Sequence, residues 1–178
     1  MDSRKHTRRA SPANVPVGVT AGVLATITMD AAMMFAILLA PDTFASDKID
    51  LAMIGRWAGG LARGRWRHDD ITAEPPMRGE LCMGLATHYL TGVVLTQVYV
   101  AALRRGDLKP DPLKAAAFGL ATSVLPLLIL YPSMGYGCCG RRADDARRLL
   151  RVMLLGHVAF GAGIGLGTAL PWGSAAAE

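Results

Sequence analysis

Four long apolar stretches constrain the fold of this chain more than any other feature of its sequence. They cover about residues 16–40, 81–103, 113–131 and 149–170. A helix that crosses a bilayer needs about 20 mostly apolar residues, and each stretch is close to that length. A soluble amphipathic helix would keep a polar face, which these stretches lack. The sequence therefore predicts an all-α polytopic membrane protein with four transmembrane helices.

The composition supports a membrane location and favours lipid over nucleic acid as the binding partner. The chain is 52% hydrophobic, and its net charge of +5 comes from arginines in the segments that flank the apolar stretches. Basic residues in such places fit lipid head groups better than nucleic acid, so we expect a bilayer with anionic lipids as the partner. Three cysteines without a Cys-x-x-Cys pair exclude a disulfide scaffold, a zinc ribbon and a thioredoxin motif.

The domain organisation follows from the same stretches. We expect a disordered basic tail over residues 1–14, a single four-helix membrane domain over 15–172 and a short tail over 173–178. The first stretch is too long for the apolar core of a signal peptide and contains Asp30, so we interpret it as a retained helix. The basic tail favours cytoplasmic termini, although Lys and Arg are nearly balanced between the two sides.

The first connection, residues 41–80, carries a second helical pattern. Its apolar residues recur every four positions, which predicts a short helix lying in the membrane interface with an N-cap at Ser46-Asp47: Ile49, Met53, Trp57 and Leu61. The arginines of this connection are candidates for binding lipid head groups: Arg56, Arg63, Arg65 and Arg67. The alternative is a solvated loop of mixed charge.

Helix packing also leaves marks in the sequence. Pro126 lies inside the third stretch and predicts a kink there. Three small-residue motifs predict close helix contacts, either within one bundle or between two copies: Gly18-x-x-x-Gly22, Gly161-x-x-x-Gly165 and Gly163-x-x-x-Gly167. The chain is therefore a possible homodimer, or a component of a larger membrane complex.

Three ionisable residues lie well inside the apolar stretches: Asp30, His88 and His157. Counted from the ends on one side of the membrane at 1.5 Å per residue, all three lie roughly 10–15 Å deep. Each stacks on small or hydroxylated residues that mark a helix interface. We therefore expect them to meet inside the bundle as a ligand- or proton-binding site, with Glu80 and the loop His68-Asp69-Asp70 at its entrance.

Several interpretations of this cluster remain open. It could relay protons, bind a small ligand, or hold a metal ion or haem through His88, His157 and Asp30. Copper is a candidate because thiolate and thioether ligands favour soft ions. The cysteines and all methionines after the first lie in one half of the bundle. The cluster could also be interhelical glue, meaning hydrogen bonds that only hold helices together, in a structural or assembly subunit. A lipid-acting enzyme is a third hypothesis, which no nucleophile–base pair supports. The leading prediction is a binding or transport-accessory protein.

Several motifs resemble a bacterial inner-membrane family that is described only as a domain of unknown function. They follow one another in the order Ala25-Thr26 with Met29-Asp30, Gly55-Arg56-Trp57, Arg63-Gly64-Arg65 with Arg67-His68-Asp69, His88-Tyr89 with Gly92, Pro132-x-Met134-Gly135-x-Gly137, and His157 with Phe160-Gly161. The resemblance implies a four-helix protein of the bacterial inner membrane. It brings no activity, cofactor or catalytic residue, and Cys138-Cys139 depart from its pattern of small residues.

Overall fold

The chain folds as a bundle of helices in a computed structural model that describes residues 14–44 and 50–175. Four segments are long and apolar enough to cross a membrane: Val17–Leu39, Glu80–Arg105, Pro112–Ser133 and Ala146–Ala169. They agree closely with the four predicted stretches, and every regular element among the described residues is helical. The predicted all-α, four-helix fold is therefore confirmed. The predicted tails lie largely outside the described residues and stay predictions.

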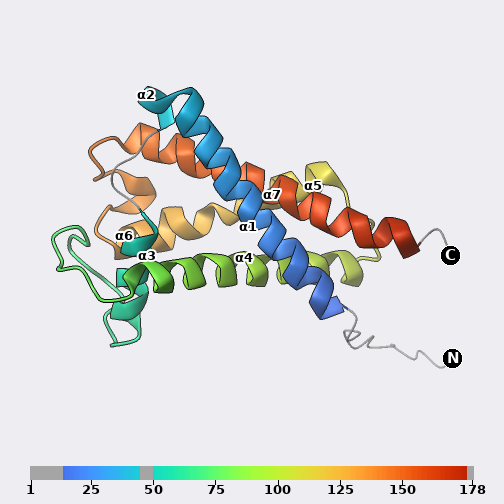
Figure 1. The fold of residues 1–178 in the computed structure, drawn as a ribbon, viewed down its shortest axis with the longest axis horizontal. Coiled ribbons are helices and arrows are strands. Elements are labelled where there is room, and N and C mark those ends of the chain that lie inside the picture. Colours follow the sequence, from blue (N-terminus) through green and yellow to red (C-terminus); the bar gives the residue numbers. More distant parts are fainter. Residues whose placement is uncertain (1–13, 45–49, 176–178) are drawn as a thin grey trace, which may run out of the picture.

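The helices follow one another along the chain as α1 (Asn14–Leu39), α2 (Pro41–Phe44), α3 (Leu51–Leu61), α4 (Glu80–Arg105), α5 (Pro112–Thr122), α6 (Tyr131–Ser133) and α7 (Ala146–Ala175). Figure 1 shows that α1 begins and α7 ends at one end of the bundle, whereas α2, α3 and α6 lie at the opposite end. The first and third connections therefore share one side, as four alternating spans require.

Glycines bring the long helices into contact. Gly163 and Gly167 of α7 face α1, and a Cβ on Gly163 would lie 2.6 Å from the Cα of Ala25. Gly161 and Gly165 face α5 from another side of the same helix. Gly18 and Gly22 of α1 face α4, as their nearest atoms show. All three predicted glycine motifs thus face other helices of this chain, and in each motif at least one glycine lets backbones approach closely.

The outer faces of the long helices remain apolar. Large hydrophobic side chains of the long segments that are more than half exposed lie along α1, α4, α5, α7 and the segment after α5: Met34, Phe35, Leu38, Leu39, Leu81, Leu90, Val94, Val98, Leu113, Leu128, Ile129 and Leu166. A soluble protein rarely exposes apolar surface of this extent. Such a surface fits a lipid environment, in which apolar side chains face acyl chains.

Pro126 interrupts the third span, as predicted. Proline has no backbone N–H and cannot donate the helical hydrogen bond to the residue four positions earlier. The chain widens there into a π-helical turn over Pro126–Leu130, and the Tyr131 N–H donates to the Pro126 carbonyl. The helix then resumes as α6. The kink expected from the sequence is therefore a change of helix type.

The short helix predicted in the first connection exists, but its start differs. Asp50 is the N-cap of α3, and its carboxylate accepts a hydrogen bond of 2.8 Å from the Met53 N–H. The N-cap of this helix is therefore Asp50 and not the predicted Ser46-Asp47. Ser46 and Asp47 lie outside the described residues. The helix packs against the first turns of α4, because Gly55 and Gly84 let the two backbones meet; a Cβ on Gly55 would lie 2.7 Å from the Gly84 nitrogen.

Candidate functional site

Asp30 of α1 and His88 of α4 are joined by a hydrogen bond between two membrane-length helices. The His88 Nε2 donates to Asp30 Oδ1 at 3.0 Å. The Tyr89 hydroxyl donates to the other carboxylate oxygen at 3.1 Å. One carboxylate thus receives two donors from consecutive residues of α4. We call Asp30, His88 and Tyr89 the carboxylate triad.

Small residues one helical turn away bring the triad together. Thr26 of α1 is buried, and its hydroxyl donates to the Gly22 carbonyl at 2.9 Å. Gly92 of α4 lies directly against the Thr26 hydroxyl, where a Cβ would collide. Because α1 and α4 are antiparallel, Asp30 lies one turn beyond Thr26 and His88 one turn before Gly92. The close approach at Gly92 therefore sets the 3.0 Å contact between Asp30 and His88.

The triad lies deep in the span yet remains open on one side. Asp30 is nine residues before the end of α1, and His88 is eight residues after the start of α4. These separations correspond to about 12–14 Å along the helices at 1.5 Å per residue. The side chain of Asp30 is 40% exposed and that of His88 is 18% exposed. The carboxylate therefore lies at the edge of the α1–α4 seam, rather than sealed inside the bundle as the sequence suggested.

His157 lies in the neighbouring helix without a hydrogen bond to the triad. Its Nδ1 donates to the Met153 carbonyl of its own helix at 2.8 Å. The adjacent Gly156 packs against Met29, the residue before Asp30, which places His157 at a similar level of the bundle. Among the described residues, the structure thus joins Asp30 to His88 but leaves His157 bonded within α7.

Tyr89 is the triad residue that sequence analysis missed. Neighbouring residues of a helix project in different directions, so its position next to His88 did not place it on the same face. Its long side chain nevertheless reaches the carboxylate from the other side. The motif His88-Tyr89 was visible as part of the family resemblance, and that pairing was the available signal.

The described part of the chain contains no set of three or more side chains that could bind a metal ion at the triad or elsewhere. Across residues 14–44 and 50–175, no group of three His, Cys, Asp or Glu side chains is arranged to hold a metal ion. The His157 Nδ1 is engaged with the Met153 carbonyl, so only its Nε2 is left to bind a ligand. The haem and copper hypotheses therefore rest on the sequence pattern alone.

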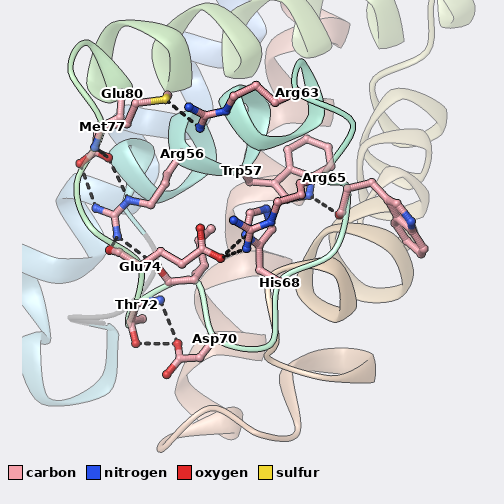
Figure 2. Close-up of polar contacts among 12 residues, drawn as sticks. Arg56, Trp57, Arg63, Arg65, His68, Asp70, Thr72, Glu74, Met77 and Glu80 are labelled. Carbon is pink, nitrogen blue, oxygen red and sulfur yellow. Dashed lines mark hydrogen bonds and ion pairs between the residues drawn. The ribbon is translucent and has the colours of Figure 1, made fainter.

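A second polar cluster lies where the first connection meets α3 and α4 (Figure 2). Arg56 Nε and Nη2 donate to the two carboxylate oxygens of Glu80 at 2.9 and 3.0 Å. Arg56 Nη1 also donates to the backbone carbonyls of Ile71 and Glu74, at 3.0 and 2.8 Å. Both charged side chains are largely buried. Glu80 therefore braces the start of α4, about 12 Å along the helix from His88 at 1.5 Å per residue.

His68 is buried against the end of α3 rather than open at an entrance. Its Nδ1 donates to Glu74 Oε1 at 2.5 Å, and its backbone N–H donates to the Ser133 carbonyl at 2.7 Å. Arg65 binds the same Glu74 oxygen (Figure 2). Burial opposes ionisation of Glu74, but the hydrogen bond and charge of His68, together with Arg65, outweigh it and lower the pKa of that carboxyl. Glu74 therefore links the loop to both basic groups.

The other candidate arginines remain on the surface. Arg63, Arg65 and Arg67 are exposed, whereas Arg56 is held inside the loop cluster. Between them Trp66 is 59% exposed, and the nearby Leu61 is 48% exposed. The segment after α3 thus presents basic and apolar side chains together. We call Leu61, Arg63, Arg65, Trp66 and Arg67 the basic tip.

The fold and the carboxylate triad define a class of protein: a small all-helical bundle with four membrane-length helices and an acid–imidazole–phenol contact between two of them. The chain belongs to the family described as protein of unknown function (DUF2938), whose family model matches residues 19–170. The resemblance noted in the sequence motifs is thereby confirmed. No curated protein and no solved structure matches the chain.

Proposed function

We propose that the protein is a membrane binding or transport-accessory protein in which the carboxylate triad takes up and releases protons within the bilayer. One observation carries the proposal. Asp30 receives hydrogen bonds from His88 and Tyr89 across the α1–α4 seam, and 40% of its side chain is still exposed. Ionisable groups at this depth are costly in lipid and usually mark paths for protons or ions.

The residue types of the triad suit proton transfer. An ionised carboxylate offers about four acceptor positions, and two donors occupy two of them. Because 40% of the Asp30 side chain is exposed, the remaining positions can accept a proton. Histidine is the usual proton carrier near neutral pH, and its position next to Asp30 allows a proton to pass between the two groups. A phenol hydroxyl completes the hydrogen-bonded chain.

The alternative of interhelical glue is less well supported by the same contacts. The α1–α4 seam is already held by close contact of Gly22 with the Val93 backbone and of Gly92 with the Thr26 side chain. A hydrogen bond that served only to join two helices would be strongest where the carboxylate is fully buried, because the local dielectric constant is low there. Asp30 is open instead, which favours a site that exchanges its ligand.

The test is proton flux through reconstituted protein. Vesicles that contain the wild-type chain, Asp30→Asn or His88→Gln receive an imposed pH gradient, and a trapped pH-sensitive dye reports its decay. Thr91→Val, an exposed change on α4 close to the triad, is the matched control. We expect wild type and the control to dissipate the gradient, and Asp30→Asn to be at least about tenfold slower because it cannot bind a proton. Equal decay in all four samples would refute the proposal, and reduced thermal stability alone in the triad variants would indicate glue.

We also propose that the basic tip binds anionic lipid head groups. Its arginines are exposed beside Trp66 and Leu61, a combination that is typical of segments at the membrane interface. Arg67→Gln should reduce the retention of phosphatidylglycerol on purified protein, measured by native mass spectrometry. Arg105→Gln, an exposed change at the opposite end of the bundle, should not. Equal retention in both variants would exclude this role.

We further propose a location in the bacterial inner membrane with cytoplasmic termini. The basic residues before the first span support this orientation. Fusions of a fluorescent protein and of alkaline phosphatase to the C-terminus distinguish the two orientations, since each is active on one side only. Cross-linking in native membranes tests the homodimer and larger-complex hypotheses.

A further inference from the structure

The turn between α6 and α7 brings two adjacent thiols face to face. Cys138 and Cys139 are free cysteines, and both are half-buried. Their sulfur atoms lie 3.8 Å apart. Adjacent residues in extended or helical backbone project apart, so this convergence needs an unusual backbone. Cys139 supplies it, because its φ of +56° lies in the left-handed region that non-glycine residues seldom adopt.

Glycines on both sides hold the pair in this conformation. Gly137 and Gly140 have φ values of +71° and +69°, which side-chain-bearing residues rarely adopt. The three residues Cys138–Gly140 form a single 3₁₀ turn between them. Arg141 Nε donates to the Cys138 carbonyl at 3.2 Å and closes the turn. The two sulfurs are therefore positioned by their own backbone before any ligand is present.

We propose that Cys138 and Cys139 form a dithiol site that binds one thiophilic metal or metalloid centre through both sulfurs. Thiolate bonds to zinc are about 2.3 Å long, and two such bonds at a tetrahedral angle place their sulfurs about 3.8 Å apart. The observed separation equals that value. A linear two-coordinate ion with bonds of that length would need about 4.6 Å, so the geometry favours a bent centre.

Positive charge close to the turn would stabilise a dithiolate once a ligand has displaced the two protons. Arg141 and Arg142 follow the pair, and positive charge near cysteine favours the thiolate, which is the form that binds metals. Without a ligand, the hydrogen bond between the sulfurs raises the pKa of Cys139, and burial acts in the same direction. Each thiol must therefore release its proton when its bond to the centre forms. Binding should weaken as the pH falls, because protons compete for the two sulfurs.

The site is independent of the carboxylate triad. It lies outside the four membrane-length segments, in the connection that precedes Ala146–Ala169. Its ligand can therefore be tested without assuming proton transfer at Asp30. The two kinds of centre that fit, a tetrahedral divalent ion and a trivalent metalloid, share the bent bis-thiolate chemistry and are separated by experiment.

The first arm uses phenylarsine oxide on the full-length protein, reduced with a phosphine. Two S–H groups and one As=O group give two As–S bonds and one water, without any change of oxidation state. We expect one probe per chain with loss of two of the three free thiols. The second As–S bond forms intramolecularly. Release of the probe should therefore need a monothiol concentration at least about a hundredfold higher than release from a single As–S bond. A 1,2-dithiol should release it.

Serine variants assign the site. Cys138→Ser and Cys139→Ser should each lose resistance to the monothiol, whereas Cys82→Ser, the matched control at the third cysteine, should keep it. If a variant fails to fold, the number of thiols lost per probe on the wild-type chain still shows whether one probe binds two sulfurs. Loss of one thiol per probe, or equal release by monothiol from wild type and the 138 and 139 variants, excludes a trivalent metalloid, and zinc binding then decides whether the site exists.

The second arm uses zinc alone, with a chromogenic chelator as competitor. Zinc retained by wild type and by Cys82→Ser, but lost in the other two variants, assigns a divalent ion. Retention of the arsenical without zinc assigns a trivalent metalloid. Failure of both ligands to engage the two sulfurs together refutes the site.

Discussion

Arg56 and Glu80 form a two-pronged ion pair that ties α3 to the first turn of α4. Arg56 Nε and Nη2 donate to the two oxygens of Glu80 at 2.9 and 3.0 Å. The same guanidinium donates to the carbonyls of Ile71 and Glu74, and Glu80 accepts the Met77 N–H at 2.8 Å. One arginine thus joins two helices and the loop between them, so the end of the bundle depends on its planar fork of donors.

Removing either partner of this ion pair should loosen that end of the bundle. Arg56→Met leaves a largely buried carboxylate without its partner, and Glu80→Gln leaves the arginine without its countercharge. We expect each to lower the melting temperature in micelles by roughly 5 °C or more. Arg56→Lys should also destabilise, because an ammonium cannot reproduce the two-pronged contact.

Arg78→Gln is the control for this prediction, since Arg78 is exposed in the same connection. It should leave the melting temperature nearly unchanged. Melting temperatures of Arg56→Met and Arg78→Gln that agree within error would show that the ion pair contributes nothing.

Two glycines four residues apart on α7 should respond differently to alanine. A Cβ on Gly161 would lie 2.7 Å from the Cα of Ala116, so the α5 backbone must move. A Cβ on Gly165 would lie 3.4 Å from its nearest atoms, which is ordinary contact. We expect Gly161→Ala to cost about 1–3 kcal/mol. Gly165→Ala should be neutral, or stabilising by up to about 1 kcal/mol, because alanine favours helix. Denaturant unfolding in micelles measures both, and equal effects would contradict the packing.

Stability should fall at acidic pH through Glu74. The pKa of this carboxyl is lower in the folded protein than in the unfolded chain, because His68 and Arg65 favour its ionised form over the opposing effect of burial. A group with a lowered pKa stabilises the fold fully above its unfolded value of about 4.3 and loses that effect as the pH falls through its folded value. The melting temperature should therefore drop below about pH 4–5.

Glu74→Gln should flatten this part of the pH profile and lower stability at neutral pH. Asp69→Asn is the control, because Asp69 is an exposed carboxylate in the same loop. It should keep the wild-type profile between pH 3 and 6. A Glu74→Gln profile that follows the wild type would show that other groups cause the acid loss.

The sequence was sufficient for the spans and for one contact of the site. Length and apolarity define the four membrane helices, and equal depth with stripes of small residues brought Asp30 and His88 to one level. It did not place Arg56, because its partner Glu80 is 24 residues away and two further acceptors are backbone carbonyls. Nor did the local sequence pattern identify Asp50, rather than Ser46-Asp47, as the N-cap of α3. The left-handed backbone at Cys139 was also not predicted, although the glycines at 137 and 140, which share positive φ, were a local sign of it.

The hydrogen bond between Asp30 and His88 should contribute little to stability if the triad is a site for protons. Polar contacts between membrane helices average about 0.6 kcal/mol and reach about 1.7 kcal/mol in double-mutant cycles. We expect a coupling in that range from Asp30→Asn, His88→Gln and the double variant, measured by unfolding in micelles. The variants should fold, because close packing at Gly22 and Gly92 holds the α1–α4 seam independently of the triad. Pairing Asp30→Asn with Thr91→Val gives the control cycle, with coupling near zero. A coupling above about 3 kcal/mol between Asp30 and His88 would exceed that range and identify the contact as a structural brace.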